Sequence, residues 1–215
     1  MSALAVLDYG IGGLDVWRAL HNLVPARALI YLSDSGYTPY GKLTADALAR
    51  RLETLARDLK QRGASALVIA CNAASSALPP MGDAALCLPT LGIIDAGVAI
   101  TLSSGCQRIG VIGGGRTIQS GVYQTLLERA GLDVSARVAQ PLSICVEAGD
   151  VSSPKLQRHL DELLAPLTSC DALLLACTHY PALTPLIAAR LPGVKLLDPA
   201  RELARQIHER KGATS

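Results

Sequence analysis

Short apolar runs alternate along the chain with stretches in which apolar residues recur at helical spacing. Continuous apolar runs are typical of parallel strands that are covered on both faces. Strands that alternate with helices in this way predict an α/β protein with largely parallel sheets. The runs that predict buried strands are Ala3–Leu7, Ala28–Leu32, Ala66–Ala70, Thr90–Ile94, Arg108–Ile112, Val134–Val138, Ala172–Ala176 and Val194–Leu197.

Leucine stripes predict two of the helices between those runs. Leucines that recur three or four residues apart share one helix face, which can then pack on the sheet. Gly63 is expected to end the first of these helices. A further helical stretch, Pro199 to Arg210, is expected to fold back onto the first half of the chain. The stripes consist of Leu48, Leu52, Leu55 and Leu59, and of Leu156, Leu160, Leu163 and Leu167.

Two local matches indicate that the chain contains two halves of similar design. Residues 66–72 (ALVIACN) resemble residues 172–178 (ALLLACT), and residues 6–10 parallel residues 111–115 at nearly the same offset. We therefore predict two similar α/β lobes, related by a pseudo-twofold axis, with the ligand site in the cleft between them. Residues 1–96, joined by the C-terminal segment 186–215, are expected to form the first lobe, and residues 97–185 the second.

The composition argues against several classes of partner. Half of the 215 residues are apolar and 18% are charged, which favours a packed core over disorder. The net charge of +2 argues against nucleic acid or an anionic membrane as the main partner. Phe is absent and there are only one Trp and six Tyr, so recognition of bases by stacking is not expected. No apolar run is long enough to cross a bilayer.

The six cysteines follow neither a C-x-x-C nor a zinc-finger spacing, so no metal site is predicted. The first residues lack the charged region and the long apolar stretch of a signal peptide. We therefore expect a cytoplasmic protein whose cysteines are reduced. Four of them are predicted to be small buried hydrophobic residues, namely Cys87, Cys106, Cys145 and Cys170.

The other two cysteines, Cys71 and Cys177, each come directly after an apolar run, one in each half. Ligands of open α/β sheets bind beyond the carboxyl ends of the strands, so these two thiols are expected to face a shared cleft. Inverting a carbon stereocentre needs a base that removes a proton and an acid on the opposite side that returns one. Two cysteines can exchange these roles, one as thiolate and the other as thiol, without any cofactor.

The glycine clusters at residues 10–13 and 113–115 also follow apolar runs, as in a dinucleotide-binding fold. Neither completes G-x-G-x-x-G, because Asp15 and Ile118 occupy the third glycine position. Close approach of the backbone at the start of a helix, where N–H groups can meet a carboxylate, explains them more simply. No nucleotide cofactor is predicted.

Five short segments, taken in order, resemble the glutamate racemases of the cofactor-independent aspartate/glutamate racemase family. They extend from near the start of the chain to near residue 198. The resemblance implies an isomerase that interconverts L- and D-glutamate for peptidoglycan without a cofactor or metal, and a homodimer is common in such racemases. The segments are DYGIGGL at 8–14, PYG at 39–41, CNAAS at 71–75, RTIQSGVY at 116–123 and, most distinctive, CTHYP at 177–181.

The resemblance also implies roles for individual residues. Cys71 and Cys177 become the two catalytic acid/bases, the first acting on D-glutamate and the second on L-glutamate. Asp8 assists Cys71, and His179 with Glu147 assists Cys177. Asn72 and Thr178 would hold the α-carboxylate and residues 39–41 the distal one. The residues expected to contact substrate are Tyr9, Pro39, Tyr40, Gly41, Asn72, Ala73, Thr117, Ser120 and Thr178.

Three positions depart from the family pattern, which usually has Ser in place of Tyr9, Thr in place of Ala73 and Ser in place of Lys42. A lost hydrogen bond to a charged group is worth about 1.5–3 kcal/mol. The loss of the Ser and Thr hydroxyls is therefore expected to weaken glutamate binding, and the substrate pocket is expected to differ from that of the family. A racemase for aspartate or another amino acid, and a homologue that binds an amino acid without turnover, are therefore alternatives. A thiol-redox protein is a third alternative, which the lack of C-x-x-C disfavours.

Overall fold

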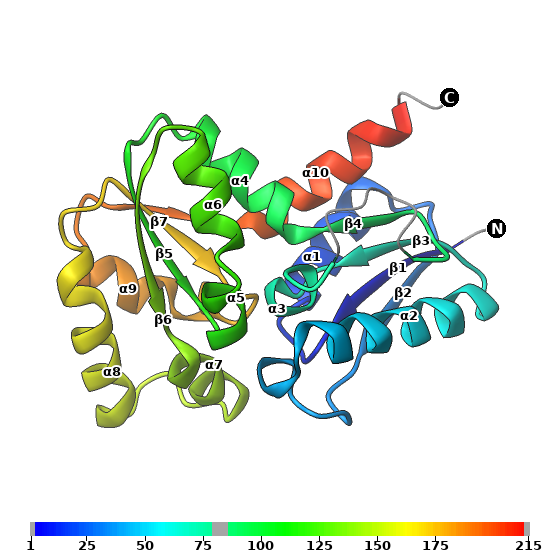
Figure 1. Ribbon diagram of the computed structural model, residues 1–215, viewed down its shortest axis with the longest axis horizontal. Coiled ribbons are helices and arrows are strands. Elements are labelled where there is room, and N and C mark those ends of the chain that lie inside the picture. Colours follow the sequence, from blue (N-terminus) through cyan, green and yellow to red (C-terminus); the bar gives the residue numbers. More distant parts are fainter. Residues whose placement is uncertain (1–2, 79–85, 213–215) are drawn as a thin grey trace.

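The computed structural model describes residues 3–78 and 86–212. It contains two four-stranded parallel sheets, ordered β2-β1-β3-β4 and β6-β5-β7-β8, which lie in two lobes (Figure 1). This confirms the predicted α/β class and the two-lobe arrangement. The strands are β1 (Ala3–Asp8), β2 (Leu29–Ser33), β3 (Ala64–Ile69), β4 (Thr90–Gly92), β5 (Arg108–Gly113), β6 (Asp133–Val138), β7 (Ala172–Ala176) and β8 (Lys195–Leu197).

The two sheets repeat one topology, since β1 to β4 occupy the same places in the first sheet as β5 to β8 in the second. The two sequence matches fall on corresponding strands. Residues 66–72 run through the end of β3 and residues 172–178 through β7, while the second match joins β1 to β5. The internal sequence repeat therefore reports a repeat of structure.

Helices cover both faces of the sheets, and the leucine stripes are their buried faces. Leu48, Leu52 and Leu59 are fully or almost fully buried in α2. The Thr44 side chain accepts a hydrogen bond from the Ala47 N–H and caps this helix, a common start signal. The helices are α1 (Leu14–Leu23), α2 (Ala45–Gln61), α3 (Asn72–Ser75), α4 (Ile93–Ser103), α5 (Gly115–Gln119), α6 (Val122–Arg129), α7 (Gln140–Glu147), α8 (Pro154–Leu164), α9 (Thr184–Arg190) and α10 (Pro199–Gly212), with 3-10 turns η1 (Tyr40–Lys42), η2 (Ala165–Leu167) and η3 (Tyr180–Leu183).

Three details of the predicted elements are wrong. The run 90–94 is a strand only as far as Gly92, and Ile93 already begins α4, because a buried helix is as apolar at its start as a buried strand. The edge strands β2, β4 and β6 have side chains that are half-buried or exposed rather than buried as predicted, and in β8 only Leu197 is buried. Helix α8 ends at Leu164, and the last leucine of the stripe, Leu167, lies in η2.

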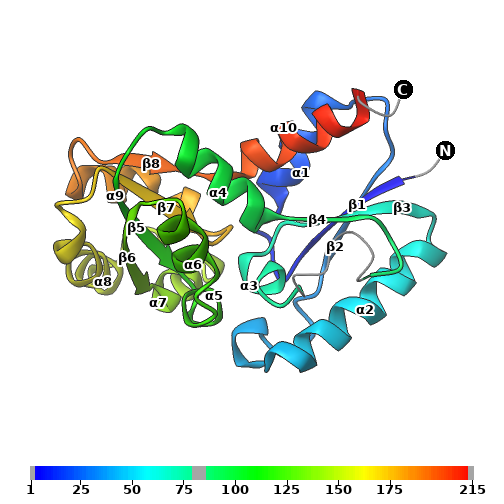
Figure 2. The same cartoon turned by 45° about the horizontal axis from the view of Figure 1, so that its top comes forward.

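Helices α4 and α10 join the lobes. Residue 97, the predicted start of the second lobe, lies inside α4. Strand β8 pairs with β7, so residues 195–197 lie with the second sheet and not, as predicted, with the first lobe. Only α10 returns, where Leu203 and Ile207 share a buried cluster with Val16 and Leu20 of α1 (Figure 2). The division of the chain into two independent domains stays a prediction.

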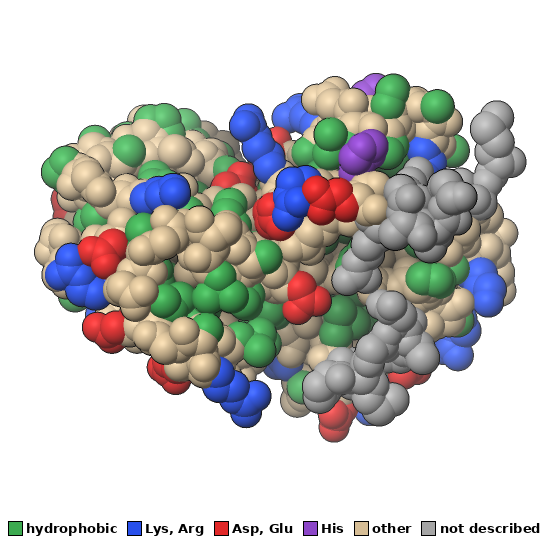
Figure 3. Space-filling view, turned by 90° about the horizontal axis from the view of Figure 1, so that it is seen from above, with side chains coloured by type: hydrophobic (Ala, Val, Ile, Leu, Met, Phe, Trp, Pro, Cys, Tyr) green, Lys and Arg blue, Asp and Glu red, His purple; other side chains and the backbone are tan. Residues whose placement is uncertain are grey.

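The surface agrees with the near-neutral composition. On the face shown in Figure 3, basic and acidic side chains of the described residues are interspersed among uncharged ones. Within residues 3–78 and 86–212, no helix combines the length and the apolar character needed to cross a membrane.

Candidate active site

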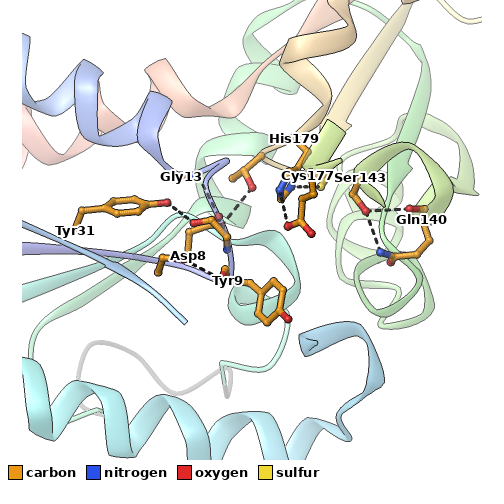
Figure 4. Close-up of polar contacts among 12 residues, drawn as sticks. Asp8, Tyr9, Gly13, Tyr31, Gln140, Ser143, Cys177 and His179 are labelled. Carbon is orange, nitrogen blue, oxygen red and sulfur yellow. Dashed lines mark hydrogen bonds and ion pairs between the residues drawn. The ribbon is translucent and has the colours of Figure 1, made fainter. Parts of the chain in front are cut away.

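The predicted site residues converge where the strands of the two sheets end. Cys71 follows β3, Cys177 follows β7, and Asp8 is the last residue of β1. The Thr178 hydroxyl donates a hydrogen bond across the lobes to Asp8 Oδ1 at 3.3 Å. Figure 4 shows Asp8 on one side of this meeting point and Cys177 with His179 on the other.

Asp8 is a completely buried carboxylate. Its Oδ2 accepts the backbone N–H groups of Gly10 and Gly13, both at 3.1 Å. Burial raises the pKa of Asp8, whereas the charge of His179 and these N–H donors act in the opposite direction. A Cβ at Gly13 would lie 2.7 Å from the Asp8 Cβ, so only glycine fits there. The first glycine cluster therefore supplies N–H donors to a carboxylate, as the sequence suggested.

Cys71 lies at the N-terminal end of the short helix α3 and is almost fully buried. Burial raises the pKa of its thiol, and the negative charge of Asp8 raises it further. The backbone N–H groups of Ala74 and Tyr9 act in the opposite direction. Burial and Asp8 together favour the thiol form of Cys71 in the free protein.

Cys177 has a different set of neighbours. Its Sγ lies 3.6 Å from His179 Nδ1. On the other side of the ring, His179 Nε2 lies 3.0 Å from Glu147 Oε1, an ion-pair contact outside hydrogen-bond alignment (Figure 4). Burial raises the pKa of Cys177 to about 12, with the backbone N–H of His179 opposing and the charges of Asp8 and Glu147 adding. His179 thus links a half-buried thiol to an exposed carboxylate.

These surroundings predict how Cys177 reacts with iodoacetamide, which attacks only the thiolate. Below a pKa of about 12, the thiolate fraction increases with pH, so we expect the alkylation rate of the free protein to rise about tenfold per pH unit from pH 7 to 10. Peptide mass spectrometry measures this rate separately for each cysteine, and the exposed Cys87 tests reagent quality at every pH. A plateau for Cys177 near pH 8 would contradict the prediction.

Asn72 and Thr178 follow the two cysteines directly and line one small cavity together with Cys177 and Gly12. Its volume of about 10 Å³ suits one water molecule. Asn72 is buried, and its Nδ2 has no hydrogen-bond partner among the described residues. A buried donor without a partner is costly, so a ligand acceptor here would be bound favourably.

The other predicted substrate contacts differ in how free they are to bind. Tyr9 donates its hydroxyl to the Tyr37 carbonyl oxygen at 3.2 Å, and Tyr40 donates its own to Asp34 Oδ2 at 2.8 Å. Ser120 is exposed and donates to the Thr117 carbonyl oxygen at 2.7 Å. These three hydroxyl protons are therefore already donated to acceptors within the protein. Of the remaining predicted contacts, Thr117 is buried, Ala73 is half-buried, and Pro39 and Gly41 are exposed.

Sequence reasoning missed several polar residues beside the cleft. Gln140, at the start of α7, accepts the Gly115 N–H at 3.2 Å. Its side chain also donates to the Ser143 hydroxyl at 3.0 Å (Figure 4). Arg116 donates from the second lobe to the Leu43 carbonyl oxygen of the first at 3.0 Å. The position of Gln140 just after β6 was the available signal, since it is the same carboxyl edge that Cys177 occupies.

The remaining cysteines lie outside this group. Cys145 and Cys170 are buried, as predicted. Cys87 is exposed and Cys106 is half-buried, so for these two the prediction of burial is wrong. No cluster of His, Cys, Asp and Glu suitable for a metal ion occurs in the described part of the chain.

Residues 10–207 match the family model of Asp/Glu/hydantoin racemases. The chain is 36% identical over 218 residues to a glutamate racemase of Pseudomonas entomophila, covering 97% of this chain and 81% of that protein. It also resembles the crystal structure of the Thermus thermophilus glutamate racemase in complex with β-chloro-D-alanine, with TM-score 0.88, 33% identity and coverage of 99% and 81%. The Francisella tularensis glutamate racemase in complex with D-glutamate gives TM-score 0.88, 27% identity and coverage of 99% and 82%.

Proposed function

The chain belongs to the Asp/Glu/hydantoin racemase family, and from this premise we propose that it interconverts L- and D-glutamate by proton transfer between two cysteines. Its membership makes it an isomerase of the amino-acid racemase type. The relatives that it resembles are glutamate racemases, and one of them binds D-glutamate in its crystal structure. We further infer that the D-glutamate formed serves peptidoglycan synthesis in the cytoplasm.

One observation carries the two-cysteine mechanism. Cys71 and Cys177 follow corresponding strands of the two repeated sheets, so they approach the cleft from opposite lobes. Each has its own acid/base neighbour, Asp8 for Cys71 and His179 for Cys177. A pair of opposed groups, each able to give and take a proton, is what inversion at carbon requires.

In the direction from L to D, the Cys177 thiolate removes the α-proton, and the electron pair of the broken C–H bond stays on the α-carbon. The Cys71 thiol then donates its proton to the opposite face of that carbon. Cys177 ends as a thiol and Cys71 as a thiolate, which is the starting state for the reverse direction. The side-chain N–H groups of Asn72 and the backbone N–H of Thr178 stabilise the charge that develops on the α-carboxylate.

The raised thiol pKa values fit this scheme, because the substrate itself brings the missing positive charge. In the free cleft, the charges of Asp8 and Glu147 both oppose ionisation of Cys177. An amino acid brings an ammonium group, which favours a nearby thiolate. The reactive thiolate is therefore expected to form mainly when substrate is bound.

A racemase with another amino acid as substrate is the second candidate, and the pocket supplies the reason. Ala73 has no hydroxyl, and Tyr9 has already donated its own to Tyr37. These are two of the three positions at which the sequence departs from the family pattern. Aspartate, which keeps the distal carboxylate but is one methylene shorter, is the first alternative to test.

Isotope exchange tests the function directly. In deuterium oxide, we expect L-glutamate to yield D-glutamate and D-glutamate to yield L-glutamate, with deuterium at the α-carbon of the inverted product. Inversion through a solvent-exchangeable thiol requires this label, and chiral chromatography with mass spectrometry measures it. The same assay with aspartate and a small panel of other amino acids separates the two candidates.

The outcomes are distinct. Inversion and labelling of aspartate but not glutamate would favour the altered-substrate racemase. Binding of glutamate in calorimetry without labelling of any amino acid would contradict the proposal and indicate a homologue that only binds. The double variant Cys71→Ala/Cys177→Ala is the control for a contaminating racemase, because it should give neither inversion nor label.

A further inference from the structure

A buried hydrogen bond joins the two lobes next to Cys71. The Tyr123 hydroxyl, from α6 in the second lobe, donates to Asn72 Oδ1 at 2.7 Å. The Tyr123 side chain is completely buried, and Asn72 is only 3% exposed. The bond therefore connects the core of one lobe to the residue that directly follows the cysteine of the other.

The Asn72 amide has one orientation in this structure, with its oxygen bonded to Tyr123 and its nitrogen without a partner among the described residues. Burial and the charge of Asp95 raise the pKa of Tyr123, so its hydroxyl keeps its proton and acts as donor. In this structure the carbonyl oxygen of Asn72 faces the hydroxyl and accepts its proton. The amide nitrogen points the other way, is buried, and has no partner within the described residues.

Helix α4 is built to admit the tyrosine hydroxyl. Gly97 lies in the middle of this helix, and a Cβ there would come within 2.5 Å of the Tyr123 hydroxyl oxygen. Glycine weakens a helix interior, so its presence on the helix that joins the lobes calls for a local reason. The space needed by the Tyr123 hydroxyl supplies one.

We propose that Tyr123 is a positioning residue, which fixes the Asn72 amide so that its N–H groups face the α-carboxylate of the substrate. This rests on the proposed function, in which Asn72 holds that carboxylate. Tyr123 itself does not touch the substrate. Because it belongs to the second lobe, it orients a donor of the first lobe only while the lobes lie together. Each half thereby helps to complete the binding site of the other.

The test is Tyr123→Phe, which removes one oxygen atom and keeps the ring. We expect KM for both glutamate enantiomers to rise about tenfold, with kcat changing less, because the amide no longer has a fixed orientation. Asn72→Ala should raise KM at least as much. The double variant should match Asn72→Ala alone, since Tyr123 acts through Asn72. Additive effects on KM, or a lower melting temperature at unchanged KM, would show a merely structural role and overturn the inference.

Two further variants guard against a folding defect. Gly97→Ala displaces the hydroxyl without removing it and should raise KM in the same way. Tyr37→Phe removes the hydroxyl of a half-exposed tyrosine outside this contact and should leave KM unchanged. A wild-type KM in folded Gly97→Ala and Tyr123→Phe would contradict the proposal.

A measurement on the free protein separates this inference from the proposed function. The side-chain amide signals of Asn72 in a ¹⁵N spectrum are identified by their loss in Asn72→Ala. We expect Tyr123→Phe to shift or broaden them, and an unchanged pair of signals would overturn the inference. If the wild type does not racemise glutamate, the proposed function fails, while this spectrum still decides whether Tyr123 orients Asn72.

Discussion

Replacing either cleft cysteine by alanine is expected to lower racemisation in both directions by at least about 10³-fold, within the range that general acid/base groups contribute. In the proposed mechanism, each direction uses Cys71 and Cys177 once, one as base and one as acid. Losing either residue therefore stops the conversion of L-glutamate and of D-glutamate equally. Chiral chromatography of both reactions measures this loss.

Isotope exchange without inversion should distinguish the two variants. Cys71→Ala keeps the thiol that acts on L-glutamate, so it can still remove the α-proton of L-glutamate and return deuterium to the same face. Cys177→Ala should show the mirror result and label only D-glutamate. If each variant labelled the opposite enantiomer instead, the assignment of the two cysteines to L- and D-glutamate would be reversed. If each variant labelled both enantiomers, the assignment would be refuted.

The matched control is Cys170→Ala. Cys170 is also buried, but it precedes β7, whereas Cys177 follows the same strand. It lies at the end of the sheet away from the cleft, beside Arg108 and Asp171. Its loss should leave the rate unchanged, and a comparable fall in rate would indicate that cysteine substitutions damage this fold generally.

Hydrophobic periodicity predicted the fold class because each element buries a regular face. It could not separate β4 from the start of α4, since Thr90 to Ile94 is one apolar run that the backbone divides at Gly92. Nor could it tell an edge strand from a central one. The exposure of β6 follows from its place beside β5 alone, and that place is set by the order of strands in the whole sheet.

Site residues were predictable where chemistry coincides with a strand end or a motif. Cys71, Cys177 and Asp8 meet this condition. The contacts that join the lobes did not, because they link residues far apart in sequence. Thr178 and Asp8 are 170 positions apart, and Tyr123 and Asn72 are 51 apart. No local pattern reports which hydroxyl finds which acceptor after the two sheets have packed.

Asp8→Asn is expected to make the protein slower and more stable at the same time. In the proposed mechanism the ionised Asp8 assists proton transfer at Cys71, so its loss should lower the rate about 10²-fold or more. A buried carboxylate costs stability when it is charged, and asparagine removes the charge while keeping the shape. The asparagine oxygen can accept from the N–H groups of Gly10 and Gly13. Its NH2 group can donate to the Thr178 hydroxyl, which reverses that bond, so all three partners of Asp8 can still be bonded.

The sign of the stability change follows from the pKa of Asp8, which lies above its ordinary value of 3.8 in the folded protein. The folded state then binds the proton more tightly, so wild-type stability falls as the pH rises from 3.8 through the folded-state pKa. The variant has no carboxyl group at this position, so its stability does not fall with pH for this reason. Its melting temperature should therefore exceed that of the wild type at pH 7, by about 2–4 °C for each kcal/mol, and the difference should vanish near pH 4.

Thermal unfolding of both proteins across this pH range, together with rates at pH 7, checks the prediction. Asp46→Asn, at an exposed position in the first turn of α2, is the control and should raise neither the melting temperature nor the rate. If Asp8→Asn proved less stable at pH 7, the glycine N–H donors and Thr178 would outweigh the cost of burial. Asp8 would then be a structural anchor of the loop after β1 as well as a partner of Cys71. A slower and more stable variant would instead show that the cleft keeps a costly buried charge for its chemistry.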